Sequence, residues 1–518
     1  MKLLNGILSQ LYESRNKTPQ QQLELVVDIS RRGFLKQVLS ATAMGVAMGT
    51  CAHRSFADGI NGLPDLGDND RSNLTPYQAD LLGKQIVLNI YSSGSMLDDY
   101  DCLDYINTLG DDLVSYSPLA GQPFNFYLIK DREINAFALP GGYICVYNGL
   151  IYYTLSEAEF SSVLSHEIGH VVQHHIFRNI SVQNRGQWLG IAGIIAGALL
   201  APFSAGASVL AMQGGQGMAA QNMLSFSRDY EREADRVGQQ LMYQAGFDAH
   251  AMPEFFQRME DAYKFNSNDA LAFLQTHPVT VERLSEAETR ANQLPVKMRQ
   301  DSISFLLIRE KCRIRQIGVS ESAKFYQSAI ASKRYVSLEA QEYGLAQSYF
   351  MNKQLAQSIA TLNKISNPAY QAHPIVIGLK ARQLIAAKNY PLADKLYDQA
   401  LGDFPNHKGL WMGQLEFLIA SKNYPKAAGR LNLLAQSNAS DPDVWDQYAI
   451  LYADDKFDNP LRYHYGLGSE YYVLGNYPAA IDQFQSVLKA KPKEYGENDI
   501  QSSASARLRS ATALAVRS

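Results

Sequence analysis

Hydrophobic and polar residues alternate before residue 150, which is typical of strands with one buried face. Phe124, Phe126 and Leu128 share one face of the stretch FNFYLIK, as in a half-buried strand. Residues 134–151, INAFALPGGYICVYNGLI, contain two apolar runs joined by Pro-Gly-Gly, which predicts a strand, a turn and a second strand. Helical periodicity extends from about residue 74 to 115, so we expect a small β-sheet packed among helices.

The next apolar segment, residues 163–175 (VLSHEIGHVVQHH), is predicted to form a helix. An uncharged stretch follows, because residues 186–227 contain no Asp, Glu, Lys or Arg. It is long enough to cross a bilayer, but it is rich in Gly and Ala and interrupted by Pro202. Backbone groups freed by such breaks need partners inside lipid. We therefore expect a lid or membrane-contacting segment; a membrane span at residues 188–212 and a buried helical hairpin are the alternatives.

The C-terminal part of the chain repeats a helical pattern. KNYPLADKLYDQAL begins at Lys388 and KNYPKAAGRLNLLA begins 34 residues later at Lys422, while GNYPAAIDQFQSVL begins at Gly475 after an insertion of 19 residues. In each unit a small residue is followed four positions later by a bulky one: Ala393 and Tyr397, Ala427 and Leu431, Ala480 and Phe484. An earlier unit around Ala346 fits loosely. The spacing resembles the tetratricopeptide repeat, in which paired helices stack into a solenoid.

The N-terminal residues resemble an export signal rather than part of the fold. Arg31 and Arg32 precede QVLSATAMGVAMGT, an uncharged and mildly apolar run. Small Ser55 and Ala57 stand where a signal peptidase would require them for cleavage before residue 58. The pattern is similar to a twin-arginine signal, so residues 1–57 are expected to direct export; a retained membrane anchor is the alternative.

Length, charge and cysteine content limit the class of protein. A chain of 518 residues exceeds one ordinary core, so two or more domains are expected. The formal net charge of -4 gives no reason to expect a nucleic-acid partner. After removal of the signal three cysteines remain, Cys102, Cys145 and Cys312. An odd number leaves at least one outside a disulfide in an oxidising compartment, and the sequence does not select a pair.

Candidate chemistry lies in residues 166–170, His-Glu-Ile-Gly-His, which match the pattern HExxH. On a helix His166 and His170 lie one turn apart on one face and can bind the same Zn²⁺. Glu167 projects beside them, where it can take a proton from a metal-bound water. Because the pattern is frequent by chance, it needs a third ligand to support it.

The neighbouring histidines do not supply that ligand. The backbones of His166 and His174 are separated by about 12 Å on a helix, whereas Zn–N bonds are about 2.1 Å long. The metzincin pattern would place another histidine at position 176, which is Ile176. We therefore expect His174 and His175 to continue the helix without a metal role.

A second segment, SRDYEREADRVG (residues 227–238), offers the missing carboxylate. Glu231 and Asp235 lie four residues apart on a predicted helix. Glu231 can ligate the metal, and Asp235 can accept a hydrogen bond from the outer nitrogen of a ligand histidine, which fixes its tautomer. Taken alone the segment would be a solvated charged helix, because three arginines interleave with the acids. Together with HExxH it predicts a zinc site.

These motifs together resemble a family of zinc peptidases. NAFALPGGYICVYNGLI, HEIGH and EREAD occur in the same order as in the family that includes the CAAX prenyl protease and HtpX. The export signal, the repeats and the lack of clear membrane spans resemble its periplasmic branch. The resemblance implies an α+β, mostly helical fold: a gluzincin-like HExxH domain with a small β-sheet at residues 58–315, followed by an all-α tetratricopeptide-repeat solenoid at residues 316–518.

The resemblance also implies site roles. One Zn²⁺ per chain would be held by His166, His170 and Glu231, with Glu167 activating the water. An exposed edge strand would bind an extended peptide by strand addition, although its residues could instead only build the sheet. The residues of this strand are Asn135, Ala136, Phe137 and Ala138.

A third motif, THPVTVERL (residues 276–284), also fits the family pattern. His277 precedes a proline, so the chain turns there. The histidine could approach the metal as a transition-state partner, or as a fourth, regulatory ligand that displaces the water. A loop histidine bonded to backbone is the alternative. Arg283 is expected to order the loop rather than to perform chemistry.

The leading functional hypothesis is a zinc endopeptidase with a chaperone-like role in the periplasm of a Gram-negative bacterium, peripheral to the outer membrane. The resemblance implies that it degrades misfolded or stalled outer-membrane proteins and supports outer-membrane β-barrel assembly, and that its repeats contact the assembly machinery. Two alternatives stay open: a largely non-proteolytic, repeat-based chaperone with a silenced zinc site, and an integral-membrane peptidase.

Overall fold

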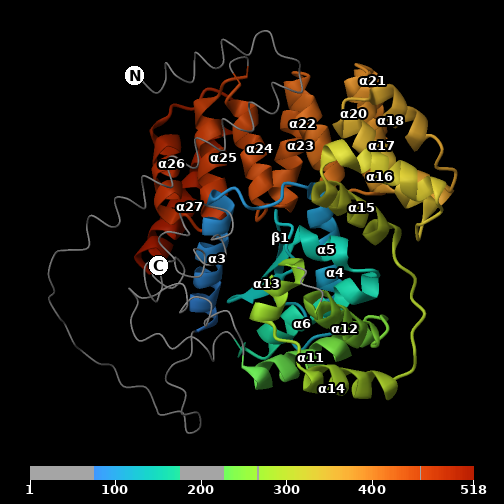
Figure 1. Ribbon diagram of the computed structural model, residues 1–518. Coiled ribbons are helices and arrows are strands. Elements are labelled where there is room, and N and C mark those ends of the chain that lie inside the picture. Colours follow the sequence, from blue (N-terminus) through green and yellow to red (C-terminus); the bar gives the residue numbers. More distant parts are fainter. Residues whose placement is uncertain (1–74, 176–226, 265–267, 455–456, 518) are drawn as a thin grey trace, which may run out of the picture. The chain divides into compact units, whose positions relative to one another are not determined.

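The computed structural model describes residues 75–175, 227–264, 268–454 and 457–517 (Figure 1). The expected export signal and nearly all of the expected lid lie outside these residues. The described residues form two compact units, one within residues 75–414 and one within residues 415–517. The boundary predicted after residue 315 falls inside helix α15 (Ile303–Ile317) and stays a prediction.

A three-stranded sheet forms the centre of the first unit. Its strands are β1 (Asn125–Ile129), β2 (Ala136–Leu139) and β3 (Tyr143–Tyr147), in the order β1-β3-β2. Strand β3 is parallel to β1 and antiparallel to β2, with Phe137 opposite Cys145. The predicted strand, turn and strand are confirmed. Gly141 and Gly142 make the turn with φ of 84° and 82°, values that a residue with a Cβ rarely adopts.

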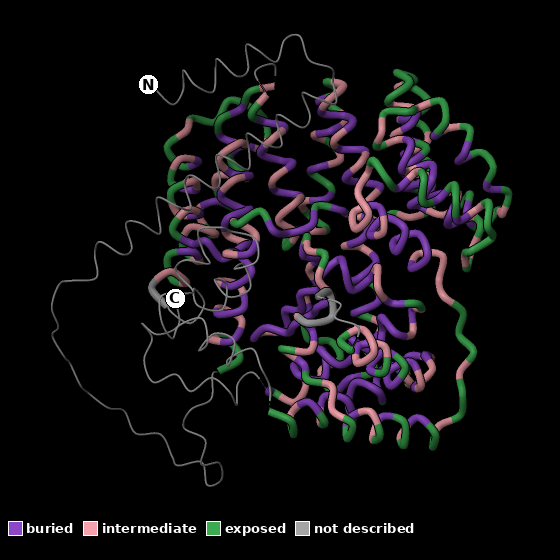
Figure 2. The backbone as a smooth tube through the Cα atoms, viewed as in Figure 1, coloured by how far each residue is buried: buried purple, intermediate pink, exposed green. Residues whose placement is uncertain are grey.

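Four helices surround this sheet: α3 (Pro76–Ser92), α4 (Tyr100–Ser115), α5 (Asn148–Tyr153) and α6 (Glu157–Val172). Helices α3 and α5 contact β3, whereas α4 contacts β1 and α6 contacts β2. Ile86, Leu128, Ile144 and Phe160 are fully buried among them, and buried residues are concentrated where the elements pack together (Figure 2). Apolar burial of this kind is the main favourable term in folding.

Four further helices of the first unit follow residue 226: α11 (Arg228–Gln244), α12 (Ala251–Lys264), α13 (Asn268–Thr276) and α14 (Val281–Asn292). Helix α11 packs along α6, and α12 contacts α6, α13 and α14. Ser227 caps the start of α11 by accepting a hydrogen bond from the Tyr230 amide. The capped start fixes where the first turn of α11, which carries Glu231, begins.

A buried ionic cluster joins α15 to the start of α4. The Lys311 ammonium lies 2.7 Å from Asp99 and 2.5 Å from Asp101, and Arg315 lies 2.7 Å from Asp99. Burial alone would raise the pKa of Asp99, but Lys311 and Arg315 hold that pKa well below its usual range. Charges removed from water are tolerated when they are paired in this way.

The helices after α15 include those of the predicted repeats. Those of the first unit are α16 (Val319–Ala331), α17 (Leu338–Met351), α18 (Leu355–Leu362), α19 (Pro368–Gln371), α20 (Pro374–Ala386) and α21 (Tyr390–Asp403). Helix α22 (Lys408–Ala420) crosses the division. Those of the second unit are α23 (Tyr424–Ser437), α24 (Pro442–Tyr452), α25 (Pro460–Val473), α26 (Tyr477–Lys489) and α27 (Glu497–Arg517).

The predicted repeat positions are buried as expected. The small residues Ala393, Ala427 and Ala480 have no exposed surface. The turn inside each pair has the same backbone conformation, with φ of 60° at Lys388, 64° at Lys422 and 80° at Gly475. Lys353 has φ of 61° between α17 and α18, so the loosely matching earlier unit has the same turn. The insertion before the third unit contains the additional helix α24.

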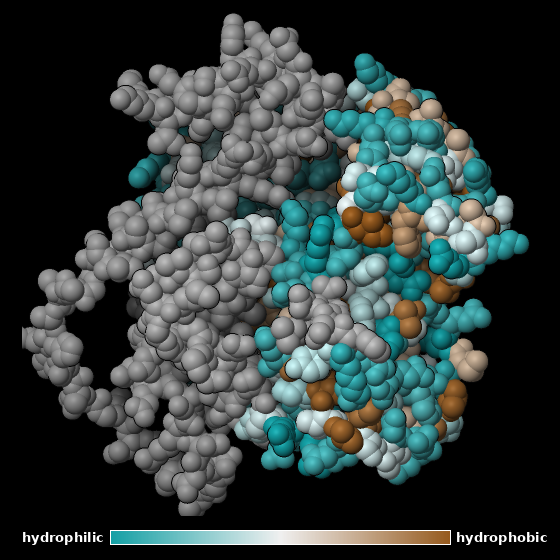
Figure 3. Space-filling model, viewed as in Figure 1, coloured by the Kyte–Doolittle hydropathy of each residue, from teal (hydrophilic) through white to brown (hydrophobic). Residues whose placement is uncertain are grey.

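The described surface carries both hydrophilic and hydrophobic residues. On the coloured part of the face in Figure 3, hydrophobic residues are scattered among hydrophilic ones. None of the described helices combines the length and the hydrophobicity needed to cross a membrane. Cys102, Cys145 and Cys312 are free and buried, so these three form no disulfide with one another.

Candidate metal centre

Two glycines allow α6 and α11 to approach closely at the candidate site. A Cβ added to Gly238 would lie 2.8 Å from the backbone nitrogen of His166, and one added to Gly169 would lie 2.9 Å from the carbonyl oxygen of Ala234. Both distances are shorter than van der Waals contact. The backbones therefore pack against each other, which brings Glu231 and Asp235 beside the histidines of α6.

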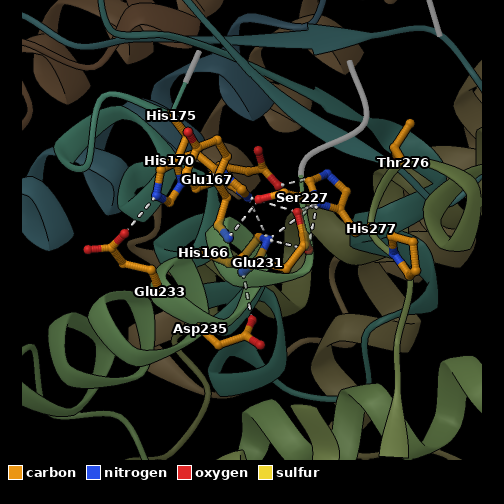
Figure 4. A network of polar contacts seen from close by, with 12 residues as sticks. His166, Glu167, His170, His175, Ser227, Glu231, Glu233, Asp235, Thr276 and His277 are labelled. Atoms are coloured by element: carbon orange, nitrogen blue, oxygen red, sulfur yellow. Dashed lines mark hydrogen bonds and ion pairs between the residues drawn. The ribbon is translucent and has the colours of Figure 1, made fainter. Parts of the chain in front are cut away.

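Four side chains converge between these helices: His166, His170, Glu231 and His277. One potential ligand atom from each lies within 4.8 Å of all the others, and the four side chains point toward one another in Figure 4. The Nε2 atoms of His166 and His170 are 3.0 Å apart. Glu231 oxygens lie 3.5 Å from His166 Nε2 and 3.3 Å from His170 Nε2. These atoms surround a point that a small ion could occupy.

His277 enters the cluster from the turn after α13. Its Nδ1 lies 3.1 Å from a Glu231 oxygen and 3.3 Å from His166 Nε2, whereas its Nε2 lies 3.4 Å from Glu167. The ring thus faces both the ligand carboxylate and the candidate base. This placement agrees with an approach to the metal and disfavours the alternative of a loop histidine bonded only to backbone.

Glu167 is fully buried, and neither of its carboxylate oxygens accepts a hydrogen bond from a described residue, although Nε2 of His277 lies 3.4 Å from one of them. A buried carboxylate that accepts no hydrogen bond is costly. Such an oxygen beside a cluster of ligand atoms is what a base for an attacking water requires. The buried carboxylate therefore indicates that the site binds a polar ligand.

Arg283 connects the carboxylates of α11 to the His277 turn. Its Nε and Nη2 donate to the two oxygens of Asp235 at 2.7 Å each, and its Nη1 lies 2.7 Å from Glu231 and donates to the Pro278 carbonyl at 2.8 Å. The expectation that Arg283 orders this loop agrees with the Pro278 bond. Its contact with Glu231 was not foreseen, because nothing in the local sequence places the two together.

Electrostatics keep the carboxylates ionised. Burial would raise the pKa of Glu231 and of Asp235, but the Arg283 guanidinium holds both pKa values below their usual range. Burial also lowers the pKa of His170 well below its ordinary value, so this ring is neutral near pH 7. Asp235 lies 2.9 Å from Nδ1 of His166, which leaves Nε2 of that ring toward the cluster. Burial would lower the pKa of His166, but its hydrogen bonds to Asp235 and Glu231 raise that pKa to about 10. Two imidazoles next to a carboxylate form a donor set that fits a divalent ion of the zinc type.

The expectation that His174 and His175 continue the helix is wrong. Helix α6 ends at Val172, and exposed His174 adopts a left-handed φ of 54°. The chain turns back there, so buried His175 lies with its Nδ1 3.0 Å from Nδ1 of His170. Helical spacing alone missed this contact; a Gln-His pair directly after the apolar run was the only local sign of an end.

Strand β2, which contains three of the four predicted peptide-binding residues, pairs with β3 and lies at one edge of the sheet. Asn135 and all residues of β2 are buried, so the expected exposure of this strand is not found in the structure. The side-chain oxygen of Asn135 accepts hydrogen bonds from the Ala136 amide at 2.9 Å and from the Thr276 hydroxyl at 3.3 Å. Thr276 precedes His277, so these bonds connect the start of the edge strand to the metal cluster.

An HExxH helix beside a small mixed sheet, with a buried carboxylate from a second helix, defines a metallopeptidase. The chain belongs to peptidase family M48, whose model matches residues 104–291. A tetratricopeptide-repeat model matches residues 384–451. The predicted fold class, α+β and mostly helical with C-terminal repeats, is confirmed, and the chain is a metalloendopeptidase.

Relatives cover most of the chain. The beta-barrel assembly-enhancing protease of Escherichia coli (strain K12) is 30% identical over 429 residues, which is 81% of this chain and 85% of that protein. The protein of the same name from Yersinia pestis is 38% identical over 232 residues, 45% of this chain and 48% of its own length. The mitochondrial metalloendopeptidase OMA1 of Schizosaccharomyces pombe is 30% identical over 196 residues, 37% of this chain and 54% of its own length.

Proposed function

We propose that this chain is a periplasmic zinc endopeptidase that cleaves misfolded or stalled outer-membrane proteins and so supports β-barrel assembly. The observation that carries the proposal is the convergence of His166, His170 and Glu231 beside the buried carboxylate of Glu167. The name of the Escherichia coli relative, beta-barrel assembly-enhancing protease, supports the choice of substrate class.

In this proposal His166 and His170 hold one zinc ion through Nε2, and Glu231 holds it through its carboxylate. A bound ion would supply Lewis-acid chemistry, since it would polarise a carbonyl and lower the pKa of a water so that its proton can be removed near neutral pH. Glu167 accepts the proton of that water and delivers it to the departing amine. Arg283 keeps Glu231 anionic and aimed into the cluster, and Asp235 holds the ring of His166.

The substrate lies along β2. Extended peptides bind a strand edge through backbone hydrogen bonds and impose little sequence preference, which suits a protease for unfolded chains. The buried β2 residues would have to be uncovered for this. The hydrogen bond that the Thr276 hydroxyl donates to Asn135 connects this edge to the turn that carries His277, so a peptide added to β2 would pass near the reacting centre.

His277 restrains the enzyme as a fourth ligand. Its Nδ1 lies 3.1 Å from Glu231 and its Nε2 lies 3.4 Å from Glu167, so the ring contacts both the ligand carboxylate and the candidate base. His277→Ala should therefore raise proteolysis of an unfolded protein. A fall in cleavage would instead assign His277 a role in assisting the reaction.

The repeats supply the partner surface. Paired helices of this type present extended surfaces for other proteins, and the outer-membrane assembly machinery is the partner that this proposal assigns to them. The enzyme would act next to the outer membrane, as a peripheral protein of the periplasm.

Cleavage of an unfolded outer-membrane protein by the zinc-loaded chain tests the proposal. Glu167→Gln should retain zinc and lose at least 100-fold of the cleavage rate, in line with the loss of a general base. Glu321→Gln, the same substitution at an exposed position on α16, is the matched control and should cleave like the wild type. Equal cleavage by wild type and Glu167→Gln would refute the peptidase mechanism.

The Glu167→Gln variant also distinguishes the proposed peptidase from a second candidate function, a chaperone that cleaves little substrate. The repeats favour this reading, because they form a large part of the described chain. If Glu167→Gln fully restores envelope function in cells that lack the protein, binding rather than cleavage is its main activity.

A further inference from the structure

His175 lies directly behind one of the two candidate ligand histidines. Its side chain has no exposed surface, and its Nδ1 lies 3.0 Å from Nδ1 of His170. The turn at His174, with φ of 54°, places it there. A buried polar ring in contact with a metal ligand is suited to fix the orientation of that ligand.

The two ring nitrogens of His170 have different partners. Its Nε2 faces the cluster, 3.0 Å from His166 Nε2 and 3.3 Å from Glu231. Ligation through Nε2 leaves the ring proton on Nδ1, and Nδ1 of His175 lies within reach of that proton. In this tautomer His175 carries its own proton on Nε2, which lies 3.2 Å from a carboxylate oxygen of Glu233 (Figure 4). Each nitrogen in the chain from His170 to Glu233 then has one defined role.

Two residues of helix α11, Tyr230 and Glu233, hold His175 in this position. The ring of Tyr230 stacks on His175 at a centroid distance of 4.4 Å and an interplanar angle of 13°, and Glu233 lies less than one turn further along the helix. His166 is supported from the same helix by Asp235, 2.9 Å from its Nδ1. Both ligand histidines are thus oriented from α11, His166 directly and His170 through His175.

We propose that His175 is a positioning residue of the metal centre. Its Nδ1 accepts a hydrogen bond from the Nδ1–H group of His170, and its Nε2–H group donates a hydrogen bond to Glu233. This inference rests on the proposed function, because it requires His170 to ligate the metal. Loss of such an outer partner typically weakens metal affinity by about 10- to 100-fold.

Two substitutions of His175 separate hydrogen bonding from packing. His175→Asn retains an acceptor near the position of Nδ1 but loses the ring, whereas His175→Phe retains a ring that can stack on Tyr230 but has no acceptor. His174→Asn is the matched control, because it makes the same change at the exposed neighbour, where the left-handed backbone suits asparagine.

Zinc affinity is measured on the purified full-length proteins by competition with a coloured chelator, and circular dichroism checks their folding. We expect His175→Phe to bind zinc about 10- to 100-fold more weakly, and both His175→Asn and the control to bind within a few-fold of wild type.

Two results would overturn the inference. Wild-type affinity in His175→Phe would show that the acceptor is dispensable, and an accompanying loss in His175→Asn would assign the residue to packing. An equal loss in both variants would show that an acceptor at this position does not sustain zinc binding. A wild-type protein that binds no zinc would be a different outcome, since it refutes the proposed function itself.

Discussion

Replacing Gly238 by alanine tests how the close contact of α6 and α11 positions the candidate ligands. The added Cβ would lie 2.8 Å from the His166 nitrogen and from the backbone carbon and oxygen of Ser165. Ordinary contacts to carbon are about 3.5–4.0 Å long, so α11 would have to retreat by roughly 0.7–1.2 Å. All three atoms belong to backbone, which cannot rotate away as a flexible side chain can.

That displacement is large for a metal site. Ligand distances must fall within about 0.2 Å of their preferred values, and Glu231 lies on the helix that has to move. We therefore expect Gly238→Ala to weaken zinc binding at least about tenfold. Overpacking should cost about 1–3 kcal/mol of stability, reduced by the gain of about 1 kcal/mol that alanine brings to a helix.

Chelator competition and thermal unfolding of the metal-free protein measure the two effects. Gly429→Ala is the matched control, since Gly429 also lies inside a helix, α23, and an added Cβ there meets no atom within 4 Å. It should leave zinc affinity unchanged and raise stability slightly. Unchanged zinc affinity in Gly238→Ala would refute the reasoning that backbone contact places Glu231.

Three further predictions concern buried charges. Arg283→Met should lower the free energy of unfolding by about 3–5 kcal/mol, because it removes the permanent positive charge that pairs with two buried carboxylates, Glu231 and Asp235; denaturant titration of the metal-free protein would contradict this if the midpoint did not move. Lys311→Met should lower the free energy of unfolding by about 3 kcal/mol. The loss stays at the lower end of the range because Arg315 continues to pair with Asp99, and a neutral effect in the same titration would argue against a stabilising role of the cluster. Asp99 has a pKa that is lower folded than unfolded, so its stabilisation is present above about pH 4 and lost as pH falls toward the folded value. Asp99→Asn should therefore lower stability at pH 7 and flatten its decline in acid, and an unchanged pH profile would contradict the assignment.

Local patterns in the sequence predicted the parts of the site that depend on local structure. Helical spacing paired His166 with His170 and Glu231 with Asp235, and alternation located the strands. The family resemblance pointed to His277 as a residue of the site. These predicted features are found in the structure because periodicity determines which side chains share a face of a helix or strand, independently of the tertiary fold.

The sequence could not predict contacts that depend on where the chain turns. His175 reaches His170 only because α6 ends at Val172 and His174 takes a left-handed conformation. Arg283 contacts Glu231 across more than fifty positions of sequence, and no local pattern encodes that distance. Packing decides where helices and strands end and which distant residues contact each other. Residue propensities therefore predict these features least well.

Anomalous diffraction at the zinc edge from crystals of the zinc-loaded protein tests the central claim most directly. The account predicts one peak per chain, about 2.0–2.2 Å from Nε2 of His166, Nε2 of His170 and a carboxylate oxygen of Glu231. A peak bound by other residues, or no peak between these three side chains, would contradict it.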